Sequence, residues 1–510
     1  MFSVARAFLL VCLLVELALV VRAEGVPPAP AGAEFTVMAY NVENLFDLDR
    51  VTSYDDYVEN PTDPNSYAPT KLLKKLKTIS TVLKSVNGGK GPDVVILNEL
   101  EVDHTPDSSL AGMKDFLRKF EGTNYEKMLT SELSDELRGL PIEAWLLKAL
   151  EDEGLKSYEI IIGDLPQNAK EHEDAIKVGI LSRFPVLSHQ TWDTPSARGI
   201  LEVVLQVGDN KLIVFGNHWK SGAGNPAMEN IRLGNAQTLR DRLDQILSED
   251  PQADVIIGGD FNTQYNQGQR YSFMTKTAIQ DVLGSQGDAK ALGGEGKPDL
   301  YNLWFDVEPE QRFTDEFNGE WGTLIQLLVS RGLGDHKGVE YVPGTFHHVM
   351  IPGVNCRDPL GLPWHWTNYG PGAGASDHFP VVATFRMVQG DASASVLRAK
   401  SSEPQKRPVK VGYDTLDRSK LRNASVLKDA SDEEMAKAIG EIFVVEGVVS
   451  KKRPVLIQVG GKEYSLYSYD ENLRKVFQTY EKGQIKKLLG ELGLFKGKLQ
   501  FVVQDPSWLK

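Results

Sequence analysis

Five short polar clusters hold the residues of this chain that could do chemistry. They are Asn41-Val-Glu43-Asn44, Asn98-Glu99, Asn217-His218-Trp-Lys220-Ser221, Gly258-Gly-Asp260-Phe-Asn262 and Ser376-Asp377-His378. Together they supply carboxylates, amides and two histidines without a cysteine. Carboxylate oxygens are ligands that Mg²⁺ and Mn²⁺ prefer, and amides and imidazoles suit the oxygens of a phosphoryl group. The set therefore predicts a metal-dependent site for a phosphoester.

Each cluster alone is a weak signal. A glutamate at a strand end is usually just solvated, and a single histidine more often caps or packs than catalyses. Gly258-Gly-Asp260 on its own reads as a turn closed by an aspartate side chain. Five clusters of compatible chemistry are harder to explain as ordinary surface.

Each cluster must be positioned by an element that ends beside it. Apolar strand-like runs at 35–40, 93–97, 212–216 and 255–257 lead into the first four clusters. Between the first two, apolar residues recur at helical spacing over 70–86, which predicts an amphipathic helix closed by Gly88-Gly89. Catalytic residues commonly lie where such a scaffold ends.

The remaining pattern predicts a layered α/β fold. Further strands are expected at 178–181, 201–207, 324–329 and 381–385, and a long helix at 226–247. Strands mixed with helices in this way indicate one large α/β (α+β) sandwich over residues 34–388.

The C-terminal part is expected to be a separate domain. Residues 389–428 are rich in Ser, Ala, Lys and Pro and are interpreted as a linker. Within 429–510, short strands at 442–449, 455–459, 464–469 and 499–503 surround a helix at 472–482, which predicts a small β-barrel. Ser431 and Glu434 form a capping box that opens another short helix.

Charge is distributed unevenly along the chain. The formal net charge is −14, yet residues 391–510 hold 22 Lys and Arg against 16 Asp and Glu. An acidic body with a basic tail fits a cation-using module joined to one that seeks polyanions, although two unrelated domains would look the same. Tyr464, Tyr467 and Tyr469 would suit stacking on single-stranded nucleic acid if exposed, or would otherwise pack the barrel.

The N-terminus reads as a secretory signal peptide, residues 1–23. Arg6 precedes an apolar run over 7–21, and Val21 and Ala23 occupy the −3 and −1 positions of a cut after Ala23. The run is short and contains Glu16, so we expect no stable membrane insertion and a secreted or periplasmic protein. Cleavage would remove Cys12 and leave Cys356 without an internal disulfide partner.

In order and spacing, these motifs resemble the endonuclease/exonuclease/phosphatase superfamily, whose members look like DNase I. The similarity rests on Ala-Tyr-Asn-Val-Glu-Asn-Leu-Phe-Asp47 and Ser-Asp-His-Phe-Pro380, with support from Lys177-Val-Gly-Ile-Leu-Ser-Arg-Phe-Pro185 and Arg198-Gly-Ile-Leu201. It implies a four-layered sandwich over 34–388. The C-terminal segment resembles an OB-fold barrel, chiefly in Phe443–Val449 and Gly497–Pro506.

The resemblance also implies roles for individual residues. The metal, Mg²⁺ or Mn²⁺, would be held by Glu99 and Asp377, with Asn41 and Glu43 beside it. Asp260 would orient or deprotonate the attacking water, and Asn262 would bind a phosphate oxygen. His218 and His378 would stabilise charge on the phosphoryl group. Lys220, Ser221 and Arg232 would assist at the phosphate, or would simply be solvated or lie on a helix face.

One position departs from the family pattern. Where members commonly have an Asp that pairs with the last histidine, the matching run here places Ile325. An apolar side chain cannot hold the tautomer of His378. Either another carboxylate such as Asp335 or Glu340 substitutes, or the register is shifted, or activity is reduced.

The sequence favours an exported metal-dependent phosphodiesterase, most simply an endonuclease on DNA or RNA. A phosphatase or lipid phosphodiesterase on the same fold remains open, because fold does not decide substrate. A nucleic-acid-binding protein with impaired turnover is the third reading. The sequence leaves the oligomeric state undetermined.

Overall fold

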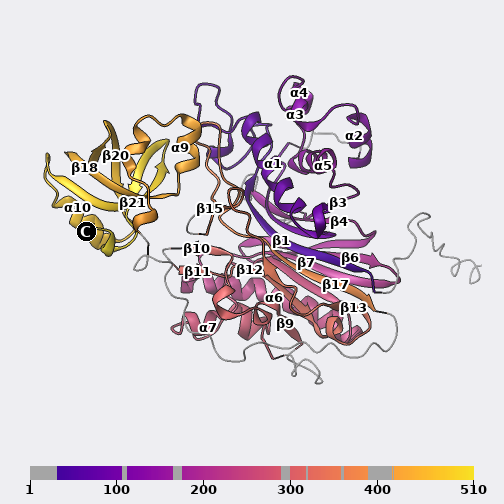
Figure 1. The fold of residues 1–510 in the computed structure, drawn as a ribbon. Helices are drawn as coiled ribbons and strands as arrows, with labels where there is room; N and C mark the ends of the chain where they lie inside the picture. The colour runs from indigo at the N-terminus through magenta and orange to yellow at the C-terminus, as the bar shows by residue number, and fades with distance from the viewer. Residues whose placement is uncertain are drawn as a thin grey trace, which may run out of the picture.

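The computed structural model describes residues 32–105, 112–164, 175–288, 299–317, 320–357, 361–388, 416 and 418–509. The expected signal peptide and most of the expected linker lie outside these residues. Figure 1 shows a large sandwich of sheets and helices and, beside it, a smaller barrel drawn in orange and yellow. Within the described ranges, no helix combines the length and apolar character that a membrane crossing requires.

The first sheet of the sandwich is mixed and has seven strands. Its order is β13-β17-β1-β2-β4-β3, and β14 pairs with β17. At its centre, β1 and β2 run parallel, so that Asn41 pairs with Asn98 before a bulge interrupts the ladder. The strands are β1 (Glu34–Leu45), β2 (Val94–Glu101), β3 (Glu159–Ile162), β4 (Ile176–Ser182), β13 (Gly338–Tyr341), β14 (His347–His348) and β17 (Val381–Val388).

The second sheet has six strands in the order β5-β6-β7-β8-β12-β9. Here β7 and β8 run parallel, and their last paired residues are His218 and Asp260. The strands are β5 (Val186–Thr194), β6 (Ala197–Val207), β7 (Asn210–His218), β8 (Val255–Asp260), β9 (Leu300–Asn302) and β12 (Ile325–Ser330). In both sheets, the parallel central strands thus end at predicted polar clusters.

Strand alternation builds four layers. In β1, Val37 and Ala39 face the second sheet, whereas Met38 and Tyr40 face the helices on the other side. Successive strand side chains point to opposite faces, so one strand contributes to two cores. A third core lies between the second sheet and helix α6 (Pro226–Glu249). The predicted four-layered α/β sandwich is confirmed.

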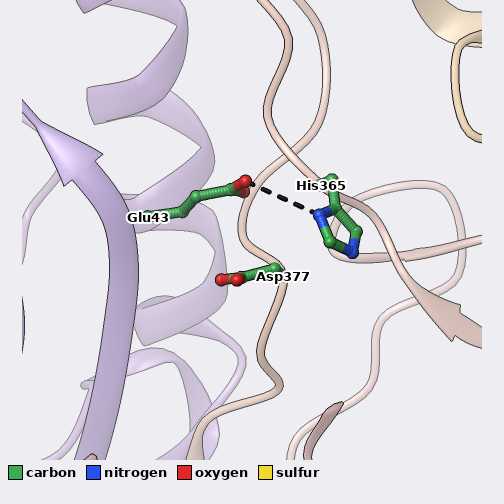
Figure 2. A group of neighbouring side chains, drawn as sticks. All are labelled: Glu43, His365 and Asp377. Atoms are coloured by element: carbon green, nitrogen blue, oxygen red, sulfur yellow. Dashed lines mark ion pairs between the residues drawn. The ribbon is translucent and has the colours of Figure 1, made fainter. Parts of the chain in front are cut away.

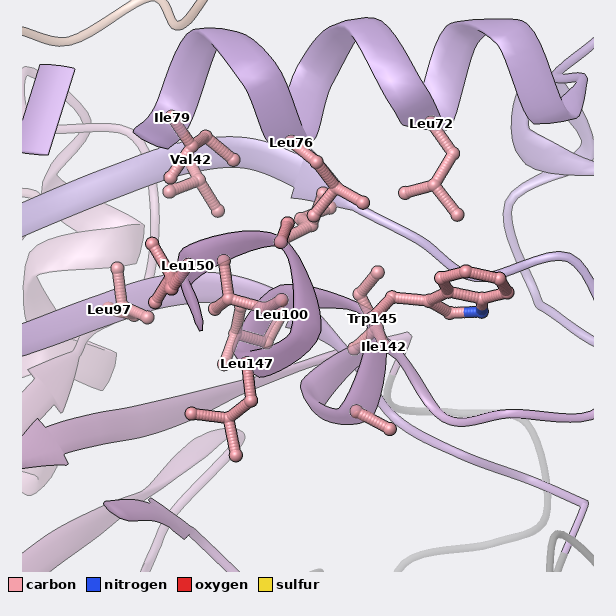
Figure 3. Close-up of a cluster of buried hydrophobic side chains, with 14 of the residues drawn as sticks. Val42, Leu72, Leu76, Ile79, Leu97, Leu100, Ile142, Trp145, Leu147 and Leu150 are labelled. Atoms are coloured by element: carbon pink, nitrogen blue, oxygen red, sulfur yellow. The ribbon is translucent and has the colours of Figure 1, made fainter. Parts of the chain in front are cut away.

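The helical layer over the first sheet is formed by α1 (Pro69–Lys84) and α5 (Ile142–Asp152). Figure 3 shows Leu72, Leu76 and Ile79 of α1 descending onto Val42 and onto the buried face of α5. The helix α1 matches the predicted span within a few residues, with Pro69 at its first turn. Shorter helices are α2 (Met113–Lys119), α3 (Tyr125–Met128), α4 (Asp135–Arg138) and α7 (Gln267–Arg270).

Residues 442–502 form a closed five-stranded barrel in the order β18-β19-β20-β22-β21. Helix α10 (Glu471–Gln478) connects the third strand to the fourth, and α9 (Asp432–Ala438) precedes the barrel with the predicted capping box at Ser431 and Glu434. The strands are β18 (Ile442–Lys452), β19 (Val455–Val459), β20 (Lys462–Tyr467), β21 (Ile485–Phe495) and β22 (Lys498–Val502). The predicted small β-barrel is confirmed.

Two expectations about this region need correction. Tyr464 is 2% exposed and packs in the barrel core at 4.8 Å from Phe501, so it is not available for stacking, whereas Tyr469 is 66% exposed. Ala424 and Leu427, expected in the linker, are buried in the same core. The core of the barrel therefore includes chain from before residue 428.

The barrel docks on the sandwich through α9 and the loop that follows. The Arg357 guanidinium donates to the carbonyl of Lys437 at 2.9 Å and to that of Ile439. Gly370 approaches Asp432 so closely that an added Cβ would lie 3.1 Å from it. A cleft of about 620 Å³ lies beside this contact, lined by both Trp366 and Leu494.

Candidate active site

The predicted clusters converge at one end of the two sheets. Asn41 lies between two carboxylates, and its amide nitrogen donates to Glu99 Oε1 at 2.8 Å and to Asp260 Oδ2 at 3.1 Å. Its own oxygen accepts from the backbone N–H of Glu43 at 2.9 Å. The buried Asn41 amide is thus bonded to Glu99 of the first sheet and to Asp260 of the second.

A second amide fixes the two sheets at this edge. Asn98 on β2 donates to the carbonyl of Asn217 at 2.8 Å and accepts from the backbone N–H of Asp260 at 3.0 Å. The hydroxyl of Ser376 likewise donates to the carbonyl of Asn41 at 2.7 Å. Because every strand end is tied to another, the side chains between them have defined positions.

Four residues here have left-handed backbone conformations without being glycine. They are Glu43 (φ 49°), Asn44 (φ 61°), Glu99 (φ 68°) and Asn262 (φ 49°). Such conformations cost of order 1–3 kcal/mol each and cluster at functional sites. At Glu99 this conformation accompanies a side chain whose Oε2 accepts from the Asn44 N–H at 3.0 Å.

The two predicted histidines lie against Asp260. His218 Nε2 is 3.8 Å from both Glu99 Oε1 and Asp260 Oδ2, and His378 Nε2 is 3.9 Å from Asp260 Oδ2. Both rings are buried, at 3% and 7% exposure. His378 Nε2 and His218 Nδ1 have no hydrogen-bond partner among the residues described.

Electrostatics separates these two histidines. Burial disfavours both imidazolium forms. For His218, burial together with Arg198 and His378 holds the pKa well below its usual value. For His378, the carboxylates of Asp377, Asp260 and Asp315 outweigh burial and hold the pKa well above it. These opposite directions favour a charged imidazole at His378 and a neutral one at His218 near neutral pH.

His378 pairs with a carboxylate although Ile325 occupies the position where the family commonly has an Asp. His378 Nδ1 lies 2.7 Å from Asp377 Oδ1, and Asp315 lies beside His378 as its backbone neighbour. Glu340 is instead bound by His336 and Arg386, away from this ring. Ile325 is fully buried in the core between the sheets. Asp335 accepts from the Lys337 N–H at 2.8 Å, so neither it nor Glu340 is the partner of His378, which is nevertheless paired with Asp377.

The site is rich in negative charge. Glu43 and Asp377 are half-buried, and Asp260 is 2% exposed. Burial and the nearby carboxylates of Asp377 and Asp260 raise the pKa of Glu99 to about 7, against the opposing effect of Asn41. Several carboxylates gather here, and a divalent cation prefers oxygen ligands. These residues therefore fit the Mg²⁺ or Mn²⁺ that the sequence predicts.

The predicted phosphate-side residues behave differently from one another. Asn262 lines the cleft, its amide donating to the Trp219 carbonyl at 3.1 Å. Lys220 is half-buried and Ser221 is exposed at the start of the loop that lines the cleft. Arg232 is fully buried, with its guanidinium bonded to Glu229 and to the carbonyls of Lys220 and Ala223. Direct phosphate contact by Arg232 is not supported, because its donors already brace this loop.

The cleft in front of these groups has a volume of about 790 Å³. Its floor includes Asp377 and His378, and its rim includes Tyr271 and the exposed Phe317. His365, which sequence reasoning missed, also lines it. His365 lies in an irregular loop whose sequence shows no strand pattern. The histidine itself was the only signal that could have identified this position.

Comparison with known proteins agrees with the predicted resemblance. The family model described as "Endonuclease/Exonuclease/phosphatase family" matches residues 173–387. That part of the chain therefore resembles a family whose members include nucleases and phosphodiesterases. A search of the curated proteins found no match.

Solved structures with a related arrangement are distant. Truncated Caenorhabditis elegans TDP2 is 16% identical, with a TM-score of 0.36, over 69% of this chain and 97% of that one. D. rerio TDP2, complexed with a single-strand DNA product, is 14% identical, with a TM-score of 0.37, over 70% and 100%. The human Nocturnin catalytic domain, with bound sulfate, is 13% identical, with a TM-score of 0.34, over 69% and 93%. Similarity this distant says nothing about substrate or activity.

Proposed function

We propose that this chain is an exported, divalent-metal-dependent phosphodiesterase, and specifically an endonuclease acting on DNA or RNA. The observation that carries the proposal is the convergence of Glu99, Asp260 and the two histidines. His218 Nε2 lies within 4 Å of Glu99 and Asp260, and His378 Nε2, which lines the cleft, lies within 4 Å of Asp260. Phosphodiester hydrolysis requires an aligned water, a cation on the oxygens and donors where negative charge accumulates.

The residues divide between these tasks. Asp260 would orient the attacking water and accept its proton, since Oδ1 already accepts from the Asn262 N–H at 2.8 Å and Oδ2 faces the site. His378, charged and with a free Nε2, would donate to the oxygen on which negative charge develops. His218, neutral, would act as a hydrogen-bond donor at a second oxygen. Opposed pKa values in one site are the usual sign of such divided roles.

A cation fits beside these groups. Glu99, Glu43 and Asp377 would hold Mg²⁺ or Mn²⁺, with Asn41 orienting Glu99, and the cation would supply Lewis-acid stabilisation of the phosphoryl oxygens. Asp377 and Asp260 would keep His378 charged. Asn41 bonds Glu99 to Asp260 of the other sheet, and Ser376, next to Asp377, bonds the Asn41 carbonyl, so the arrangement is preorganised.

The barrel is proposed to bind the nucleic acid. Its basic balance, its β-barrel architecture and the exposed Tyr469, packed edge-on against Tyr467 at 5.3 Å, support a single-strand surface. Export through the signal peptide at residues 1–23 would place the enzyme where extracellular or periplasmic nucleic acid is its substrate.

Substrate class is tested with a panel. Purified protein is incubated with plasmid, single-stranded DNA, RNA and phosphoinositides, in Mg²⁺, in Mn²⁺ and in EDTA. Cleavage of a nucleic acid that EDTA abolishes supports the proposal. Turnover of phosphoinositides alone would indicate a lipid phosphodiesterase or phosphatase instead. Binding of nucleic acid without turnover would indicate a binding protein.

A further inference from the structure

We propose that His365, Glu43 and Asp377 together bind a first-row transition cation. We further propose that His365 determines which cation the chain prefers. The inference rests on the proposed function, because it concerns the cation that the hydrolysis would use. His365 belongs to none of the five predicted clusters. It comes from the loop between β16 (Leu362–Pro363) and Asp377.

The three side chains are arranged around one point. Each offers a ligand atom, and these atoms lie within 4.8 Å of one another. His365 Nδ1 is 3.7 Å from Glu43 Oε1, which is too long for a hydrogen bond. Two ligands that each approach a cation to about 2.1 Å lie roughly 3–4 Å apart. Figure 2 shows the imidazole and the Glu43 carboxylate facing each other, with Asp377 beside the space between them.

The backbone on both sides of His365 is fixed. The carbonyl of Trp364 accepts from the N–H groups of Ala375 and Ser376, at 2.7 and 3.1 Å. On the other side, the Trp366 N–H donates to Glu43 Oε2 at 2.6 Å. The loop that carries His365 is thus hydrogen-bonded to the Glu43 carboxylate and to Ala375 and Ser376, which directly precede Asp377.

Close packing of the loop that carries His365 requires a glycine at position 374. At Gly374 (φ 96°) an added Cβ would lie 2.0 Å from the His365 carbonyl oxygen, so only glycine fits. Beneath the loop, Lys75 donates to the Glu43 carbonyl at 2.6 Å and lies 4.6 Å from the centre of the Trp366 ring. The positions of His365 and Glu43 are therefore set by buried structure although the imidazole itself is 57% exposed.

The ligand chemistry points to particular cations. Mg²⁺ is bound by oxygen ligands and gains little from an imidazole, whereas Zn²⁺ and other later first-row cations bind imidazole strongly. Two carboxylates alone would favour Mg²⁺, Ca²⁺ or Mn²⁺. Adding His365 shifts the balance toward Zn²⁺ most and toward Mn²⁺ less. Glu99, His218 and Asp260 form a neighbouring ligand set, so the contribution of His365 must be isolated by substitution.

The test measures cation binding without substrate. The metal-stripped full chain is titrated calorimetrically with Zn²⁺, Mn²⁺ and Mg²⁺, as wild type and as His365→Asn. The substitution is expected to weaken Zn²⁺ binding by about tenfold or more and Mn²⁺ binding by less, while Mg²⁺ affinity changes by less than about threefold. His189→Asn, at an exposed position of β5, is the matched control and should leave all three affinities unchanged.

Three results would overturn the inference. They are an unchanged Zn²⁺ affinity in His365→Asn, an equal loss for all three cations, or no cation binding by the wild type. Thermal melting of both variants, expected to match wild type, verifies that a lost affinity is not a lost fold. The substrate panel fails or succeeds independently, so a chain that selects Zn²⁺ through His365 but cleaves no nucleic acid would refute the proposed function and not this site.

Discussion

At the residue scale, the proposed mechanism depends on two histidines whose pKa values are shifted in opposite directions. Asp315 is buried beside His378, and its Oδ1 accepts from the Leu324 N–H at 3.1 Å. Asp315→Asn keeps an acceptor there and removes a negative charge, so it should lower the pKa of His378. NMR titration of the imidazole measures this directly, and the alkaline limit of activity should move to lower pH with it. An unchanged His378 titration would show that Asp377 and Asp260 alone set its charge.

Ile325 belongs to the same scale. It pairs with Asp260 across β12 and β8, and its side chain is fully buried in the apolar core. Ile325→Asp would bury a carboxylate without a partner and should reduce the free energy of unfolding by about 3 kcal/mol or more, without raising turnover. Ile325→Val should cost only about 1 kcal/mol. Denaturant unfolding of both variants provides the measurement, and a turnover gain in Ile325→Asp would revive the impaired-histidine interpretation.

At the element scale, Asp254 ties two sheets together just before β8. Its Oδ2 accepts from the Val339 N–H of β13 at 2.9 Å. Burial, with Asp335 and Asp250, raises its pKa to about 7. The folded state then binds a proton that the unfolded state releases near pH 4, so stability falls as pH rises from about 4 to 7.

Asp254→Asn should therefore raise the free energy of unfolding at pH 8, by on the order of 2–4 kcal/mol, and change little at pH 4. The amide still offers an oxygen to Val339. Urea unfolding at the two pH values tests this. Equal stability of variant and wild type at pH 8 would mean that Asp254 is charged in the folded protein at no cost.

Elements with a clear apolar period could be predicted from the sequence, and the others could not. The helix α1 and strands such as β8 and β19 lie where the pattern places them. The strand β21 was missed because Ile485-Lys-Lys-Leu-Leu-Gly-Glu-Leu has helix-like spacing, and pairing with β18 and β22 overrides it. The strand β5 was missed because it is an exposed edge with mostly polar side chains. His365 and Asp315 lie in segments whose position only tertiary contacts determine.

At the scale of the whole molecule, the barrel and the sandwich are expected to share one substrate. Tyr469→Ala removes an exposed ring and should weaken binding of single-stranded DNA by about 1–3 kcal/mol. Tyr464→Phe, in the barrel core, should leave that affinity unchanged. Fluorescence anisotropy at two salt concentrations measures both. Equal affinity of Tyr469→Ala and wild type would assign the barrel a structural or protein-binding role.

The central claim is that the convergent carboxylates and histidines form a metal-dependent phosphodiesterase site. Its most direct test is plasmid cleavage by Glu99→Gln in Mg²⁺ and Mn²⁺ beside wild type. Glutamine keeps the hydrogen bonds of Glu99 in part and removes its charge, so the fold should persist while metal-dependent cleavage falls by about a hundredfold or more. Wild-type cleavage that EDTA abolishes and Glu99→Gln lacks is the predicted result. Near wild-type cleavage by Glu99→Gln would contradict the account.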